Sequence, residues 1–268
     1  MRTQFVRYAA TAAVVATLAG CGSDSPTGPG DTATDLAPVL AEISTGSAAS
    51  FSGAPVGAVS AGSATAAWVP SSCAFSSSTK AFACPAVTLN GVTIARSFFL
   101  YDASGTALSA WDPKTTASVR TVTDVSGTLS PPPNFSGSIN VSRHDDITLS
   151  GLLTGTHTLN GAGSGHSDAQ LTNTQGTNRL VVDETSKTTN LVLPGKGANS
   201  VFPQSGTIEL NQTLTVTLGS NAPTTAMMRE VFTFDGTSVV SIDFTVGGTT
   251  RNCKLNLANF AASVGCSV

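Results

Sequence analysis

Strict alternation of apolar and polar residues is the feature of this sequence that most constrains its fold. In the segment 207–218, apolar side chains occupy positions 208, 210, 214, 216 and 218, and only Gln212 departs from the pattern. Successive side chains of a β-strand point to opposite faces, so a period of two predicts a strand with one buried and one wet face. Such strands are typical of antiparallel sheets, because the strands of parallel sheets are usually buried on both faces.

Turn signals separate further alternating segments from about residue 51 onward, which is typical of antiparallel β structure. Asn90-Gly91 lies between the segments 87–89 and 92–94 and predicts a two-residue hairpin loop. The strand through 97–101 is expected to end at a turn over 102–105.

Polar clusters inside longer apolar segments also indicate turns. We expect a solvated turn at His144-Asp145-Asp146, and a hairpin in which 183–188 joins 180–182 to 191–193. The segment 156–178 is rich in Gly, Ser, Asn and Thr, and it is expected to form strand ends and loops.

The Asp235-Gly236 pair predicts a hairpin whose loop length follows from matching the two apolar faces. Phe232 and Val240 must share a face if one side of the hairpin is to be apolar. A two-residue loop would place even positions opposite odd ones, whereas a three-residue loop over 234–236 keeps even positions together. We therefore expect the three-residue loop, with Gly236 in the left-handed conformation of a bulge.

These segments predict an all-β fold of about ten to fourteen antiparallel strands, in a long meander that forms a curled sheet, a sandwich or an open barrel. One short N-terminal helix is expected over 34–43, because Thr34 can cap it and its apolar residues share one face. No sequence period of about 20–50 residues repeats, so the sequence does not favour a propeller or a solenoid.

The N-terminus has the layout of an export signal. Arg2 and Arg7 precede an apolar segment, 9–18, that is shorter than the roughly 20 residues needed to span a bilayer. Next, Leu18-Ala19-Gly20-Cys21 resembles the lipobox of bacterial lipoproteins. The resemblance covers only residues 1–21, and it implies cleavage before Cys21 and acylation of that cysteine.

This resemblance sets the expected organisation of the chain: a signal peptide over 1–20, a lipid-anchored tether over 21–34, and a single β domain over 35–268. Gly, Ser and Pro make the tether flexible and extended, with nothing to bury. Two or three acyl chains would attach the protein stably to a membrane of the cell envelope. In enterobacterial lipoproteins an Asp after the cysteine favours inner-membrane retention, so Gly22 favours the outer membrane.

Further cysteines in an exported chain meet an oxidising compartment. Folding the segment 73–84 about a four-residue loop places Cys73 opposite Cys84 and Phe75 opposite Phe82, which is consistent with a disulfide-bonded hairpin. A zinc site and reactive thiols are the alternatives, but no C-x-x-C motif or suitably spaced histidine accompanies these cysteines. The expected disulfides, chosen by short spacing, are Cys73–Cys84 and Cys253–Cys266.

Composition argues against a polyanionic partner. Charged residues make up 11% of the chain, its net charge is −3, and its basic residues form no cluster, so no nucleic-acid partner is expected. No cofactor is expected either. The glycine-rich segment 161–165 lacks the Lys-Ser/Thr of a phosphate-binding loop, and the segment 194–197 is expected to be an exposed turn.

The titratable residues form no recognisable catalytic or metal-binding motif. His144, His157 and His166 could converge only through tertiary folding, and neighbours in a strand point in different directions. Paired acids can also come together only in space. The four glutamates available for such a pair are Glu42, Glu184, Glu209 and Glu230.

Three hypotheses about function follow. The leading hypothesis is a non-enzymatic, lipid-anchored structural or interaction module of the bacterial envelope. The alternative is a carrier that binds an apolar or lipid ligand in the concave face of a curled sheet. The third is a hydrolytic enzyme, which requires titratable side chains that converge in one cleft.

Overall fold

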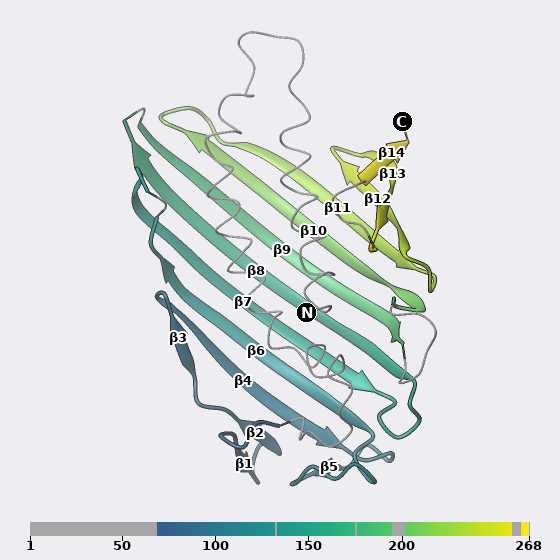
Figure 1. The fold of residues 1–268 in the computed structure, drawn as a ribbon. Helices are drawn as coiled ribbons and strands as arrows, with labels where there is room; N and C mark the ends of the chain where they lie inside the picture. The colour runs from purple at the N-terminus through teal and green to yellow at the C-terminus, as the bar shows by residue number, and fades with distance from the viewer. Residues whose placement is uncertain (1–68, 132, 175, 195–201, 259–263, 268) are drawn as a thin grey trace.

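The structure is a computed structural model that describes residues 69–131, 133–174, 176–194, 202–258 and 264–267 (Figure 1). These residues form one 14-stranded antiparallel sheet. The strands are β1 (Ala74–Ser76), β2 (Ala81–Ala83), β3 (Val87–Leu89), β4 (Val92–Tyr101), β5 (Ala107–Leu108), β6 (Ser118–Leu129), β7 (Ser136–Ser150), β8 (His157–Asn173), β9 (Gly176–Leu193), β10 (Ser205–Leu218), β11 (Thr224–Phe234), β12 (Val239–Val246), β13 (Thr249–Asn256) and β14 (Val264–Ser267).

The predicted all-β antiparallel meander is confirmed. From β6 to β14 each strand pairs with the next one along the chain, while β2, β3 and β5 all pair with β4 (Figure 1). The described part contains no helix, and none of its residues forms a helix suited to crossing a membrane. The helix expected over 34–43 lies outside the described residues.

The finer expectation of a curled sheet, a sandwich or an open barrel is wrong for the described residues, which form a single sheet that is neither closed nor strongly curled (Figure 1). Curvature in sheets is introduced largely by bulges and glycine kinks. The pairings of the long strands show register shifts at only two places in the described part, between Leu159 and Gly161 and between Ser205 and Thr207. The alternation of apolar and polar residues within each strand carries no information about how strongly the sheet curves.

The central strands are longer than expected: β7, β8 and β9 contain 15, 17 and 18 residues. The turn predicted at His144-Asp145-Asp146 is wrong because these residues lie inside β7, and the loop predicted over 183–188 lies inside β9. The segment 156–178 contains the whole of β8 and the first residues of β9 rather than mainly loops. The polar residues of these three segments lie within strands, where they face solvent or pair with residues of neighbouring strands. Their polarity therefore does not mark turns.

Two hairpins test the turn predictions. The Asn90-Gly91 loop is confirmed, with φ of 51° and 82° at its two residues and Leu89 paired with Val92. Such positive φ values are what a two-residue type I′ turn requires.

The three-residue loop predicted over 234–236 is wrong, because Thr233 pairs with Ser241. The even positions still share a face as predicted, and Gly236 is left-handed with φ of 88°. Contacts from outside the hairpin help to hold the longer connection, since the Gly236 N–H donates to the carbonyl of Pro203 at 3.0 Å.

The sheet has a packed face and a wet face. The packed face carries most of the buried apolar side chains, which gather in three clusters around Leu149, Leu180 and Leu100. The wet face carries mainly Thr, Ser, Asn and charged residues. Gln212, the exception to the alternation in β10, therefore points into the packed face among buried residues.

Candidate functional site

Polar side chains cross the middle of the packed face at right angles to the strands. Strand pairing places Asp145, Gly163, Ser186, Leu210 and Glu230 in one row. It places Arg143, Gly165, Glu184 and Gln212 in the adjacent row. We call five of these residues the central belt: Arg143, Asp145, Glu184, Gln212 and Glu230.

Arg143 is the cation of the central belt and its side chain is only 5% exposed. Its Nε donates to Asp145 Oδ2 at 2.8 Å, and its Nη1 donates to Glu184 Oε1. Burial lowers the pKa of Arg143, but the hydrogen bond to Asp145 and the charge of Glu184 outweigh this effect and raise it above its ordinary value. A buried charge is tolerated only when it is paired in this way.

Glycines in β8 leave room for this pairing. Arg143 lies on β7 and Glu184 on β9, so the arginine side chain must pass over β8. A Cβ at Gly163 would lie 2.2 Å from Asp145 Oδ1 and 2.7 Å from Ser186 Oγ, while one at Gly165 would lie 3.6 Å from Arg143 Nη1. Glycine within a strand often marks a site of close approach. The segment 161–165 is therefore not a loop. It is part of β8, and its glycines leave the packed face without side chains at these positions.

Gln212 completes the contacts of Glu184. Its Nε2 donates to Glu184 Oε2 at 3.0 Å, so both oxygens of that carboxylate are paired. The one departure from alternation in β10 thus supplies a half-buried hydrogen-bond donor where an apolar residue would leave Glu184 Oε2 without this bond.

Glu230 differs from the other acids of the belt. The residue is 2% exposed, and both of its carboxylate oxygens are buried without a hydrogen-bond partner among the described residues. Its cross-strand neighbours are Leu210 on β10 and Phe244 on β12. Burial first, and the charge of Glu184 second, raise the pKa of Glu230 to about 7.

On the wet face, charged residues pair from strand to strand. Arg120 on β6 makes a bidentate contact with Asp146 on β7 at 2.7 and 2.6 Å. Arg179 on β9 pairs with Asp168 on β8 at 2.9 and 2.7 Å. Asp146 and Asp145, neighbours in sequence, therefore lie on opposite faces, as adjacent strand residues must.

The structure brings two of the three candidate histidines near each other. His144 faces Ser164, and His166 faces Ser142, so the two imidazoles are diagonal neighbours on the wet face. Each is about half exposed, and each Nδ1 lies 2.7 Å from an aspartate, that of Asp124 on β6 for His144 and that of Asp183 on β9 for His166. Asp124 and Asp183 lie on β6 and β9, the strands on either side of the β7–β8 pair that carries the histidines. The two histidines therefore contact aspartates on opposite sides rather than each other.

His157 lies apart from this pair. It is at the start of β8 in the packed-face register, and burial lowers its pKa. Across the described ranges, no three His, Cys, Asp or Glu side chains are arranged to hold a metal ion. Of the glutamates considered from sequence, Glu184 and Glu230 approach each other on the packed face, Glu209 pairs with Arg229 on the wet face, and Glu42 lies outside the described residues.

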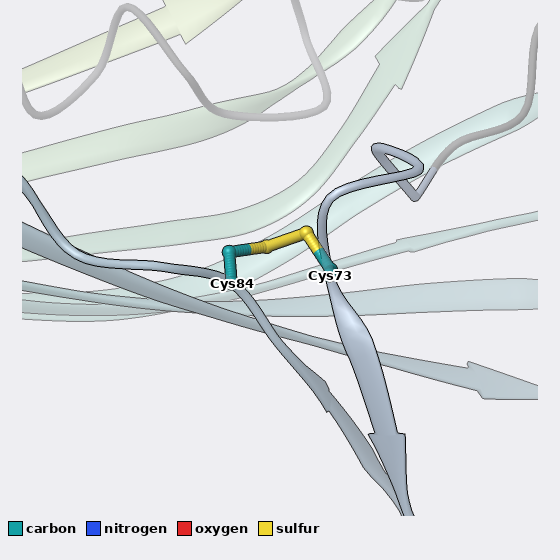
Figure 2. Close-up of a disulfide and its surroundings, with 2 residues drawn as sticks. All are labelled: Cys73 and Cys84. Atoms are coloured by element: carbon teal, nitrogen blue, oxygen red, sulfur yellow. A yellow bond between two sulfur atoms is a disulfide. The ribbon is translucent and has the colours of Figure 1, made fainter.

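The first predicted disulfide is present: Cys73 and Cys84 are bonded across the β1–β2 hairpin (Figure 2). The register is the predicted one, with Phe75 opposite Phe82 and their ring centroids 5.1 Å apart. The second pair stays a prediction, although the β13–β14 register places Cys253 opposite Cys266.

The lipidation site Cys21 and the tether over 21–34 lie outside the described residues. The turn expected over 194–197 also lies almost entirely outside them.

Comparison with known proteins gives no relative for this chain: no protein-family model, curated protein or solved structure matches it.

Proposed function

We propose that this chain is a lipid-anchored, non-enzymatic protein of the bacterial cell envelope, and that it acts as an interaction module through the wet face of its sheet. The residues Leu18-Ala19-Gly20-Cys21 support the anchor by their resemblance to a lipobox. The Cys73–Cys84 disulfide supports an exported, oxidised location. Gly22 favours the outer membrane, as argued from the sequence.

The observation that carries the interaction proposal is the ordered state of the wet face. Three of its arginines, Arg120, Arg179 and Arg229, are held in cross-strand pairs, of which Arg120–Asp146 and Arg179–Asp168 are bidentate. Immobilising such side chains on binding costs about 0.5–1.5 kcal/mol each. Side chains that are already fixed in the free protein lose less conformational entropy on binding. A broad polar face of this kind therefore suits binding to another protein of the cell envelope.

The two other hypotheses have less support. The carrier hypothesis required a concave apolar face, and the described sheet is neither closed nor strongly curled (Figure 1). The hydrolase hypothesis required converging titratable groups that are available for chemistry. His144 and His166 bind aspartates on opposite sides, and Glu184, the acid near Glu230, is already bound by Arg143 and Gln212.

The anchor is tested by intact-mass spectrometry of the protein from the membrane fraction. We expect a chain that begins at an acylated Cys21, and we expect Cys21→Ser to move the protein to the soluble fraction. A wild-type mature chain without acyl groups would contradict the anchor. Ser23→Ala is a matched control that leaves the lipobox intact.

The interaction face is tested by placing a photo-crosslinking residue at Ser164, near the middle of the wet face, in cells that make the full chain. The control carries the same residue at Ala103, an exposed position of the turn after β4. We expect one discrete adduct from position 164 that is absent from position 103. Absence of a specific adduct at position 164 and at its neighbour across the strands, Thr185, would overturn the proposal.

A further inference from the structure

Glu230 is a buried titratable group that has no assigned role. It lies in the middle of β11, at the β11 end of the central belt, and is 2% exposed. A carboxylate buried without a partner is costly, and such a group becomes neutral by keeping its proton. The proton is therefore part of the packed state of this region.

Within the described part of the chain, the surroundings of Glu230 offer no cation to replace that proton. On β10 it faces Leu210, with Gln212 and Ile208 as diagonal neighbours, and on β12 it faces Phe244. These flanking residues bring no positive charge close to the carboxyl group.

The charged groups further along the belt do not compensate either. Glu184 on β9 adds a negative charge, while Arg143 on β7 already binds Asp145 and Glu184. Arg251 on β13 is exposed and is separated from Glu230 by Phe244 of the intervening strand.

We infer that Glu230 is a proton-controlled latch for the β10–β12 part of the sheet. With its proton, the neutral acid packs between Leu210 and Phe244. When the proton passes to water, the carboxylate becomes a second negative charge beside Glu184, and β11 must move or admit water to hydrate it. The inference concerns the fold and holds independently of the proposed interaction module.

The direction of the response follows from linkage. The folded-state pKa of Glu230 is about 7, above the value of 4.5 for a free glutamate. The folded state therefore binds more protons than the unfolded state between these values, so stability falls as pH rises from about 5 to 7 and levels off above that range. Opening of β10–β12 becomes more frequent by up to about a hundredfold across this range.

The test is amide hydrogen exchange of the full chain between pH 5.5 and 8.5, corrected for the intrinsic pH dependence of exchange. In the wild type we expect protection in β10–β12 to fall with rising pH by on the order of tenfold to a hundredfold. In Glu230→Gln, whose side chain has nearly the same shape and no titrating proton, protection should be independent of pH in this region. Glu209→Gln, which removes a wet-face carboxylate of the same sheet, should keep the wild-type response.

A direct titration completes the test. The carboxyl carbon of Glu230, followed by NMR, should titrate near pH 7, and Glu184→Gln should lower its midpoint by removing the neighbouring charge. Titration of Glu230 near 4.5, or wild-type pH dependence retained in Glu230→Gln, would overturn the inference. The midpoint reports on ionisation whether or not Glu184→Gln also weakens the fold.

Discussion

Arg143 and Glu184 form a largely buried ion pair although a complete strand, β8, separates the strands that carry them. The contact is possible because β8 presents glycine beneath the arginine side chain. The charge of Arg143 is therefore satisfied only if three strands carry the right residues: Arg143 on β7, glycine on β8 and Glu184 on β9.

Gly163→Ala should destabilise the protein strongly. Its new Cβ would lie 2.2 Å from Asp145 Oδ1, and Asp145 is held by Arg143, so it has little freedom to move. Overpacking of this kind costs about 1–3 kcal/mol. Chemical denaturation measures the loss.

Gly165→Ala is the matched control for that substitution. Its Cβ would meet Arg143 Nη1 at 3.6 Å, which is an ordinary contact, so its effect should lie within about 1 kcal/mol of the wild type. Equal losses from the two alanines would contradict the role assigned to Gly163.

Arg143→Met should leave the buried carboxylate of Asp145 and the half-buried carboxylate of Glu184 without their cation. Removing one partner of a buried ion pair typically costs about 3–5 kcal/mol. Arg143→Met combined with Glu184→Gln should be less destabilised than the sum of the two single variants. Urea denaturation of all four proteins gives the coupling energy, and additive losses would show that the contact is not energetically coupled.

Acid should weaken the wet face through its bidentate pairs. The hydrogen bond from Arg120 lowers the pKa of Asp146 below its ordinary value of 3.8, so the pair stabilises the fold above about pH 4 and this contribution is lost as pH falls below it. Arg120→Gln should therefore lose less stability than the wild type between pH 5 and pH 2.5. Lys114→Gln, in the loop after β5, serves as the control and should follow the wild type in thermal denaturation across this range.

Loss of the Cys73–Cys84 disulfide should destabilise the fold by about 2–3 kcal/mol, since the bond closes a short loop. Thermal unfolding of the Cys73→Ala/Cys84→Ala double variant, with and without reductant, measures this effect. Any remaining sensitivity to reductant would report the predicted Cys253–Cys266 bond. A double variant that still unfolds at the wild-type temperature would show that the hairpin is stable without its cross-link.

The sequence supports the strand class and the tight hairpins because both depend on local chemistry. Asn90-Gly91 favours positive φ, and the hairpin of Cys73 and Cys84 follows from counting residues about its loop. The long strands were missed because Asp145, Asp146 and the segment 183–188 are polar, and polarity alone does not separate a wet strand from a turn.

The central belt could not be predicted because it depends on the register of five strands at once. Two local signals pointed to it: Gln212, which breaks the alternation in β10, and the glycines at alternate positions of 161–165. Glycines with a period of two in a strand leave one face of that strand without side chains. Which charges occupy the resulting space is set only when β7 and β9 pair with β8.

The meander has a consequence for how the chain assembles. Every strand from β7 onward pairs with its immediate predecessor in the chain, so contact order is low and the sheet can grow by adding one strand at a time. If the chain is exported from its N-terminus, as the proposed lipid anchor requires, it can therefore add strands in the order in which they arrive. Arg143 has Asp145 as a partner within β7 itself, and its second partner, Glu184, follows after only two further strands, β8 and β9. Export from the N-terminus, as proposed, would thus present the strands in the same order in which the sheet adds them.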